Sequence, residues 1–347
     1  MAQILRLVTY NVAWFTALFD DKDGFLNDNS ASNRHGVSKA QQFAAVGAVF
    51  QAVDADGIMV IEAPDSNGRR SSVAALQSFA QYFGLRTFRA VTGYTSQTEQ
   101  EISFLYDPNI LSVRHDPMGT ADPTSAAPCF DVELDYWIDG QKQSARFSKP
   151  PLELEVSLKT GGNLRLIGVH IKSKAVHDGT PARFNDISVQ NRRKQLAESF
   201  WLRARIDQVL AQNHTLIVMG DLNDGPGLDH YEQKFGYSTV EVISGQPDPT
   251  KDQLFDPHSL THAKIWGQNV PTTSRFWDQS SQSYFEAMLD FIMVSENIAK
   301  TSIWRIWHPL HDPEIVANTL LAKALLTASD HFPVSIDLSL PIIPPLA

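Results

Sequence analysis

The chain has 347 residues, of which 43% are hydrophobic and 20% charged, and its formal net charge is −10. This composition is typical of a folded globular protein and excludes a disordered chain. The acidic balance argues against a general nucleic-acid binder, which needs many Lys and Arg residues for phosphate contacts. A single cysteine, Cys129, excludes an intrachain disulfide. No apolar run approaches the roughly 18 residues that cross a bilayer, and no secretory signal pattern is seen, so a cytoplasmic location is expected.

The spacing of apolar residues predicts an alternation of strands and helices. In chain order we expect a strand at 4–12, an exposed loop at 20–36, a helix capped by Ser38, a strand through Glu62, a helix over 71–83, mostly β structure from 86 to 171, a helix over 186–212, and strands at 215–220, 289–294, 301–307 and 330–338. Residues 244–283 are polar and punctuated by proline, which favours a long loop. No repeat or linker divides the chain, so one domain over residues 1–347 is expected, with two sheets packed face to face under helices.

Five apolar runs end at, or carry, a polar residue suited to phosphate chemistry. These residues are Glu62, His170, Asp221 with Asn223, Asp290, and Asp330 with His331. A carboxylate at the end of a buried strand is costly to desolvate unless a metal, a cation or another partner is near it. Five such cases in one chain predict that these side chains share one cleft.

The acidic and amide residues among them suit a hard divalent cation. Glu62 is the expected principal metal ligand, and Asp330 and Asn11 are expected nearby oxygen donors. Mg²⁺, with Mn²⁺ as a substitute, prefers such oxygen ligands and neutralises the charge of a phosphate ester. Taken alone, Glu62 would more often be a helix cap or a surface residue. Zinc is disfavoured because no HExxH pattern or close His pair on a helix is present.

Asp221 and Asn223 lie two residues apart in the chain. In an extended segment both side chains would point into the cleft. Asp221 could then orient and deprotonate a water molecule while Asn223 donates to a phosphate oxygen. The competing interpretation is an Asx turn, for which Asp, Asn and Gly are well suited.

His331 and Asp290 are expected to pair, so that a buried carboxylate fixes the tautomer of the imidazole and favours its charged form. Lys172 and Lys174 are the best candidates for contacting an anionic substrate. They lie in a basic segment from 142 to 205 with 13 Lys or Arg against 5 Asp or Glu. A solvated helix face is expected to account for part of that surplus.

Six motifs in order resemble those of the endonuclease/exonuclease/phosphatase superfamily, whose members include DNase I-like nucleases, sphingomyelinases and inositol-phosphate phosphatases. The motifs are Thr9-Tyr10-Asn11, Ile61-Glu62, Gly168-Val169-His170, Gly220-Asp221-Leu222-Asn223, Leu289-Asp290-Phe291 and Ser329-Asp330-His331. Together they span nearly the whole chain, from Thr9 to Ile336.

The resemblance implies a four-layered α/β sandwich, with two mixed sheets packed face to face, flanked by helices, and a cleft at one edge. It implies metal binding by Glu62 with Asn11 and Asp330, and water activation by Asp221. It further implies that Asn223, His170 and His331 contact the phosphate, and that Asp290 supports His331. Two departures stand out: Ala13 replaces an acidic second metal ligand of many nucleases, and His170 stands where the apurinic-endonuclease branch is built around Tyr and Asn.

These features favour a divalent-metal-dependent phosphodiesterase that acts on a small or lipid-derived substrate by activated-water attack. The alternative is a nuclease acting on DNA or RNA, which the basic segment favours and the acidic remainder disfavours. A non-catalytic binding protein on the same fold is a third interpretation, and the presence of Glu62, Asp221 and His331 argues against it.

Overall fold

The computed structural model describes residues 3–22, 24–96, 98–175, 184–225, 232–246, 248, 250–259 and 271–340. The strands are β1 (Gln3–Asn11), β2 (Gly57–Ala63), β3 (Arg89–Thr92), β4 (Glu101–Tyr106), β5 (Leu111–His115), β6 (Leu134–Ile138), β7 (Gln141–Ala145), β8 (Leu152–Leu158), β9 (Asn163–His170), β10 (Leu216–Asp221), β11 (Leu254–Phe255), β12 (Ser274–Asp278), β13 (Ser283–Ala287), β14 (Asp290–Ser295), β15 (Ser302–Ile306) and β16 (Val334–Leu340). The helices are a 3₁₀ turn (Phe15–Leu18), α1 (Lys39–Val53), α2 (Ser72–Tyr82), α3 (Phe184–Ala211), α4 (Glu232–Phe235), α5 (Thr239–Ser244), α6 (Glu296–Ala299), α7 (Pro313–Ala317) and α8 (Thr319–Ala328).

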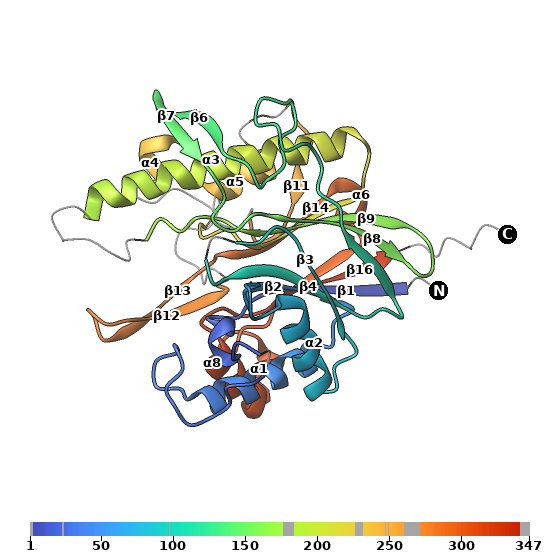
Figure 1. Ribbon diagram of the computed structural model, residues 1–347, viewed down its shortest axis with the longest axis vertical. Helices are drawn as coiled ribbons and strands as arrows, with labels where there is room; N and C mark the ends of the chain where they lie inside the picture. The colour runs from blue at the N-terminus through green and yellow to red at the C-terminus, as the bar shows by residue number, and fades with distance from the viewer. Residues whose placement is uncertain are drawn as a thin grey trace.

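Most strands belong to two six-stranded sheets. The first has the order β15-β16-β1-β2-β4-β3 and the second the order β11-β14-β10-β9-β8-β5. The pair β1 and β2 is parallel, as is the pair β9 and β10, whereas the other neighbours run antiparallel. Both sheets are therefore mixed. Helices α1, α2 and α8 cover the outer face of the first sheet, and α3 covers the outer face of the second (Figure 1). The predicted four-layered sandwich is confirmed.

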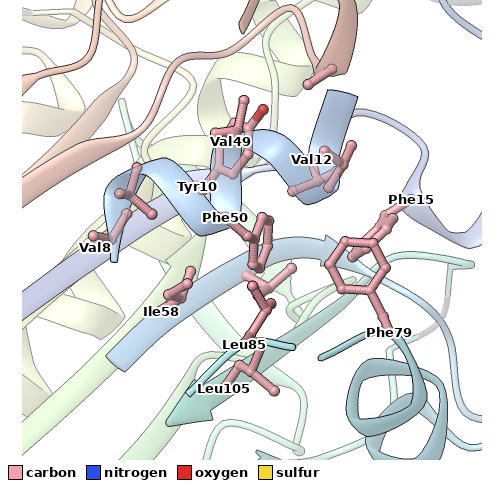
Figure 2. Packing of buried hydrophobic residues seen from close by; sticks show 14 of the residues in the cluster. Val8, Tyr10, Val12, Phe15, Val49, Phe50, Ile58, Phe79, Leu85 and Leu105 are labelled. Atoms are coloured by element: carbon pink, nitrogen blue, oxygen red, sulfur yellow. The ribbon is translucent and has the colours of Figure 1, made fainter. Parts of the chain in front are cut away.

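The alternation of side chains along each strand separates the core into layers. In β1, Leu5 and Leu7 face the second sheet, whereas Val8 and Tyr10 face the helices. Figure 2 shows Tyr10 with Val49 and Phe50 of α1 in this outer layer. Strands buried on both faces explain why the sequence shows short continuous apolar runs rather than a strict alternation.

Helix α1 begins where the sequence predicts it. The Ser38 side chain accepts a hydrogen bond from the backbone N–H of Gln41, and the Gln41 side chain accepts one from the N–H of Ser38. This reciprocal capping box satisfies two N–H groups that would otherwise lack a partner at the helix start.

Among the described residues, no helix is both long and apolar enough to span a bilayer.

Two expectations need correction. Residues 244–283 are not simply a loop, because β12 lies within them and pairs with β13 as an antiparallel hairpin. Its strands place aromatic residues next to each other, Phe276-Trp277 and Tyr284-Phe285, so the sequence does not show the apolar alternation that marks a half-buried strand. Helix α8, between β15 and β16, was also missed; it packs on α1 through Leu325 and Ala328.

Part of the basic surplus of the 142–205 segment is buried in the fold and does not lie on a solvated helix face. Arg192 and Arg205 of α3 are fully buried, and they pair with Asp224 and Glu153 respectively. Arg192 donates to the carbonyl of Tyr237 and to Thr239 at the start of α5, whereas Arg205 donates to the carbonyl of Pro128 and lies over the Phe130 ring. These arginines therefore link α3 to its neighbours and are not available to a polymeric anion.

Candidate active site

Several strands carry a row of apolar side chains that faces the other sheet. At one edge of the sandwich, each of these rows ends in a polar side chain. On β10, Ile217 and Met219 face the first sheet, and Asp221 is the next residue on the same face. By the same alternation, Asn11 follows Leu5 and Leu7 on β1, and His170 follows Leu164 and Leu166 on β9. The site thus lies at the polar end of the core between the two sheets. This position explains why the polar side chains are buried and why they contact one another.

The close approach of β9 and β10 depends on a glycine. Gly220 has φ of +147°, and a Cβ there would lie 1.9 Å from the carbonyl oxygen of Val169. No other residue fits without moving one strand. Asp221 then pairs in register with His170, which brings the two side chains together.

Asp221 Oδ2 is the point on which the site converges. It accepts a hydrogen bond of 3.0 Å from Asn11 Nδ2. Nε2 of His170 lies 3.6 Å away and Nε2 of His331 lies 3.9 Å away. Burial raises the pKa of Asp221, and the charged His331 ring opposes this shift. A carboxylate with a raised pKa is a suitable acceptor for a proton from water.

The predicted pairing of His331 with Asp290 is present in the structure. Nδ1 of His331 lies 2.8 Å from Asp290 Oδ2, so Nε2 is the atom that faces Asp221. Burial alone would lower the pKa of His331, but the Asp290 carboxylate outweighs it and raises that pKa to about 10. Thr273 holds the carboxylate in turn, since its hydroxyl donates to Asp290 Oδ2 over 2.8 Å. The imidazole is therefore a fixed cation.

His170 has the opposite character. Burial, and then the Lys149 ammonium, lower the pKa of His170 well below its usual value. Its Nε2 lies 3.1 Å from Nζ of Lys149, so the neutral ring accepts from the ammonium group. Burial lowers the pKa of Lys149 below its usual value, and the nearby Glu62 and Asp221 carboxylates offset part of that shift. Lys149 is thus a second basic side chain in the site, beside His331.

Sequence reasoning missed Lys149. It lies between β7 and β8, just before Pro150-Pro151, where no apolar run directs a side chain toward the cleft. In the sequence, Lys149 is distinguished only by lying in the basic segment, and within that segment Lys172 and Lys174 were the predicted substrate contacts. In the structure, Lys174 Nζ lies 3.3 Å from Asp224 Oδ1. Burial lowers the pKa of Lys172, and Lys194 lowers it further. Substrate binding by Lys172 and Lys174 stays a prediction.

The Glu62 side chain reaches the site because β2 is irregular at this residue. The register between β2 and β4 shifts between Ile61 and Ala63, and Glu62 has φ of +62°. Such a β-bulge re-aims a side chain, and a left-handed non-glycine residue costs about 1 kcal/mol or more, which is typical of functional positions. The backbone N–H of Trp14 donates to Glu62 Oε2 over 2.9 Å. Burial raises the pKa of Glu62, and Lys149 offsets part of that shift.

The predicted metal ligands have the features that a hard cation requires. Asn11 Oδ1 is buried and has no hydrogen-bond partner, because the amide donates through its nitrogen to Asp221. Asp330 is near enough to Glu62 to raise its pKa. Three oxygen donors of this kind fit Mg²⁺ or Mn²⁺. Asp330 is also engaged by Arg34, whose Nη1 lies 3.2 Å from Asp330 Oδ2, so a bound cation would share this carboxylate.

Asn223 differs from the extended geometry that the sequence suggested. It has φ of +50°, and its backbone N–H donates to Asp221 Oδ1 over 2.7 Å. This is the Asx-turn alternative. The Asn223 side chain donates to the carbonyl of Ile171 over 2.9 Å and lies 3.3 Å from Asp221 Oδ2. Asn223 therefore fixes the turn after β10 and still borders the general-base candidate.

The sequence matches the endonuclease/exonuclease/phosphatase family model over residues 8–331. The chain belongs to this family. Members of the endonuclease/exonuclease/phosphatase family are divalent-metal-dependent hydrolases, which agrees with the oxygen-rich donors around Glu62. No curated protein matches the chain in sequence.

Solved structures of other family members share the fold. A truncated TDP2 from Caenorhabditis elegans is 12% identical, with a TM-score of 0.51, and the match covers 97% of this chain and 98% of that one. The 3'-5' exonuclease NExo from Neisseria meningitidis is 13% identical, with a TM-score of 0.51 and coverage of 97% and 100%. The AP endonuclease LMAP from Leishmania major is 13% identical, with a TM-score of 0.51 and coverage of 97% and 88%. At such identities, the likeness concerns the fold alone.

Ser329 ties the C-terminal motif of this family member to β1. Its buried hydroxyl donates to the carbonyl of Asn11 over 2.7 Å and accepts from the N–H groups of Ala13 and His331. Ser329→Ala should lower the free energy of unfolding by about 1–3 kcal/mol, because buried polar groups lose their partner. Denaturant unfolding measures this, with the exposed Ser112→Ala as the matched control. An equal, small effect of both variants would contradict the structural role of Ser329.

Proposed function

We propose that the chain is a divalent-metal-dependent phosphodiesterase that hydrolyses a small or lipid-derived phosphodiester. The observation that carries this proposal is the convergence on Asp221 Oδ2 of Asn11, His170 and His331, with Lys149 behind His170. A proton acceptor lies there beside the His331 imidazolium and the Lys149 amine, which matches the needs of a water-attack reaction on an anionic ester.

The residues divide the work as follows. Asp221 takes a proton from the attacking water, whose oxygen forms the new bond to phosphorus while the bond to the ester oxygen breaks. The leaving oxygen takes a proton from solvent and departs as an alcohol. The His331 imidazolium and the Lys149 ammonium stabilise the negative charge that develops on the phosphoryl oxygens. Glu62, Asn11 and Asp330 would hold the divalent cation, which supplies Lewis-acid charge neutralisation when bound. Asp290 keeps Nε2 of His331 directed at the reacting group.

The distribution of positive charge supports a small substrate. A polymer-binding enzyme needs several phosphate contacts outside its active site. In the basic segment, however, Arg165 pairs with Asp116, Arg192 with Asp224 and Arg205 with Glu153. The 13 basic and 5 acidic residues give the segment a charge of +8, so the rest of the chain carries −18 and is strongly acidic. One phosphate group can be served by Lys149 and His331 alone.

A comparison of substrates at two salt concentrations tests this proposal. We expect kcat/KM to be higher for a short phosphodiester than for plasmid DNA, and to change little between about 50 and 200 mM salt, because few phosphate contacts are made. A phosphomonoester should serve as the third substrate. Preferential cleavage of DNA with a steep salt dependence would favour the alternative function, a nuclease on DNA or RNA.

A further inference from the structure

A second group of metal-ligating side chains lies outside the candidate active site. Glu286 is on β13, and His308 and His311 follow β15. Glu286 Oε2 lies 3.1 Å from Nε2 of His311 and 3.8 Å from Nε2 of His308, and the three ligand atoms all lie within 4.8 Å of one another. We infer that these three side chains bind a transition-metal ion of the zinc type, at a site separate from the hard-cation site around Glu62.

The donor set decides the class of metal. Two imidazole nitrogens and one carboxylate oxygen suit Zn²⁺, Co²⁺, Ni²⁺ or Cu²⁺, whereas Mg²⁺ prefers an all-oxygen set. With zinc–ligand bonds of about 2.0–2.2 Å, tetrahedral geometry places donor atoms about 3.3 Å apart. The two spacings to Glu286 Oε2, 3.1 and 3.8 Å, are near that value. Three protein ligands leave one position for water.

The surroundings permit the ion to enter and direct the carboxylate toward it. The His311 side chain is 52% exposed, so its ring can turn toward an ion that arrives from solvent. Nε of Arg275 lies 3.7 Å from Glu286 Oε1, whereas the two histidines and the Thr272 hydroxyl lie near Oε2. Glu286 Oε2 is therefore the oxygen that faces the histidines, and a bound metal would replace its hydrogen bond from Thr272.

His308 is the ligand that must change its tautomer. The His308 ring is buried, and both of its nitrogens have polar neighbours. Its Nδ1 accepts from the N–H of Leu310 over 3.1 Å, and Nε2 contacts the hydroxyl of Thr272 at the same distance. Metal binding at Nε2 moves the proton to Nδ1 and breaks the hydrogen bond from the N–H of Leu310. A zinc–imidazole bond outweighs that cost.

A metal at this site would fasten the β12–β13 hairpin to the segment after β15. Thr272 contacts both Glu286 and His308, and the next residue, Thr273, holds Asp290. Phe276 of the same hairpin lies 5.4 Å from the His331 ring. The ion would thus stabilise one wall of the candidate active site without taking part in the reaction.

Binding of Co²⁺ to metal-free protein in excess Mg²⁺ tests the site. Wild-type protein should bind one equivalent with the intense visible absorption of four-coordinate, nitrogen-ligated Co²⁺. His311→Ala and Glu286→Gln should each lose this equivalent and its absorption. Zn²⁺ should displace the cobalt and should raise the Tm of the wild-type protein but not that of His311→Ala.

Two control variants locate the signal. Glu62→Gln weakens the separate hard-cation site and should keep the cobalt absorption, and His214→Ala removes an exposed histidine elsewhere and should also keep it. Circular dichroism of His311→Ala verifies that the variant is folded, as expected for a half-exposed side chain. Unchanged cobalt stoichiometry and absorption in His311→Ala, loss of the absorption in Glu62→Gln, or no absorption in the wild type would each overturn the inference. None of these readouts depends on phosphodiester turnover.

Discussion

Asp221→Asn should lower kcat for phosphodiester hydrolysis by about 10²–10⁴-fold, since the amide cannot accept a proton from the attacking water. The substitution keeps the size of the side chain. An amide oxygen at the Oδ2 position can still accept from Asn11 Nδ2, so the strand end should stay in place. KM should change much less than kcat, because Asp221 acts on the water and not on the bound ester.

Steady-state kinetics and denaturant unfolding, measured on the same preparation, separate the chemical effect from a folding effect. Asp122→Asn, at an exposed position far from the site in sequence, is the matched control and should leave kcat unchanged. An Asp221→Asn protein that is folded and retains wild-type kcat would show that another group activates the water.

His331 and Asp290 should behave as one unit. His331→Ala removes a fixed cation from the site, and Asp290→Asn removes the carboxylate that keeps the ring charged and oriented over a 2.8 Å contact. Each single variant should lower kcat by about 10²–10⁴-fold. The double variant should be little less active than the more damaging single variant.

A double-mutant cycle in kcat measures this dependence. Thr273→Val supplies an intermediate case, because it removes the hydroxyl that holds Asp290 Oδ2 and leaves both partners present. Its loss of rate should disappear in the Asp290→Asn background. Additive losses for His331→Ala and Asp290→Asn would mean that the two side chains act independently.

The sequence was sufficient to predict the fold and the side chains that terminate strands. Asn11, His170, Asp221 and Asp290 each follow or begin a buried apolar run, and alternation along the strand determines the face on which such a residue lies. Because these strand ends lie at one edge of the sandwich, a strand-end pattern was enough to gather the residues. The pairing of His331 with Asp290 followed from the same reasoning.

Residues outside that pattern could not be found from sequence. Lys149 lies in an irregular segment, and only tertiary packing brings its ammonium to within 3.1 Å of His170. Glu62 itself was predicted from the sequence, but the direction of its side chain depends on a bulge and a positive φ that no local pattern indicates. Thr273 lies at the base of a hairpin that the sequence suggested was a loop. Lys174, by contrast, looked suitable from its position but lies beside Asp224.

Turnover of a short phosphodiester by metal-stripped protein, followed during titration with Mg²⁺ or Mn²⁺, tests the central claim most directly. We expect no turnover in the presence of a chelator, saturable recovery with either ion, and a higher ion concentration for half-maximal recovery in Glu62→Gln, which removes one ligand charge at nearly constant volume. Full turnover without any divalent ion, or a Glu62→Gln protein with the wild-type metal dependence, would contradict the account.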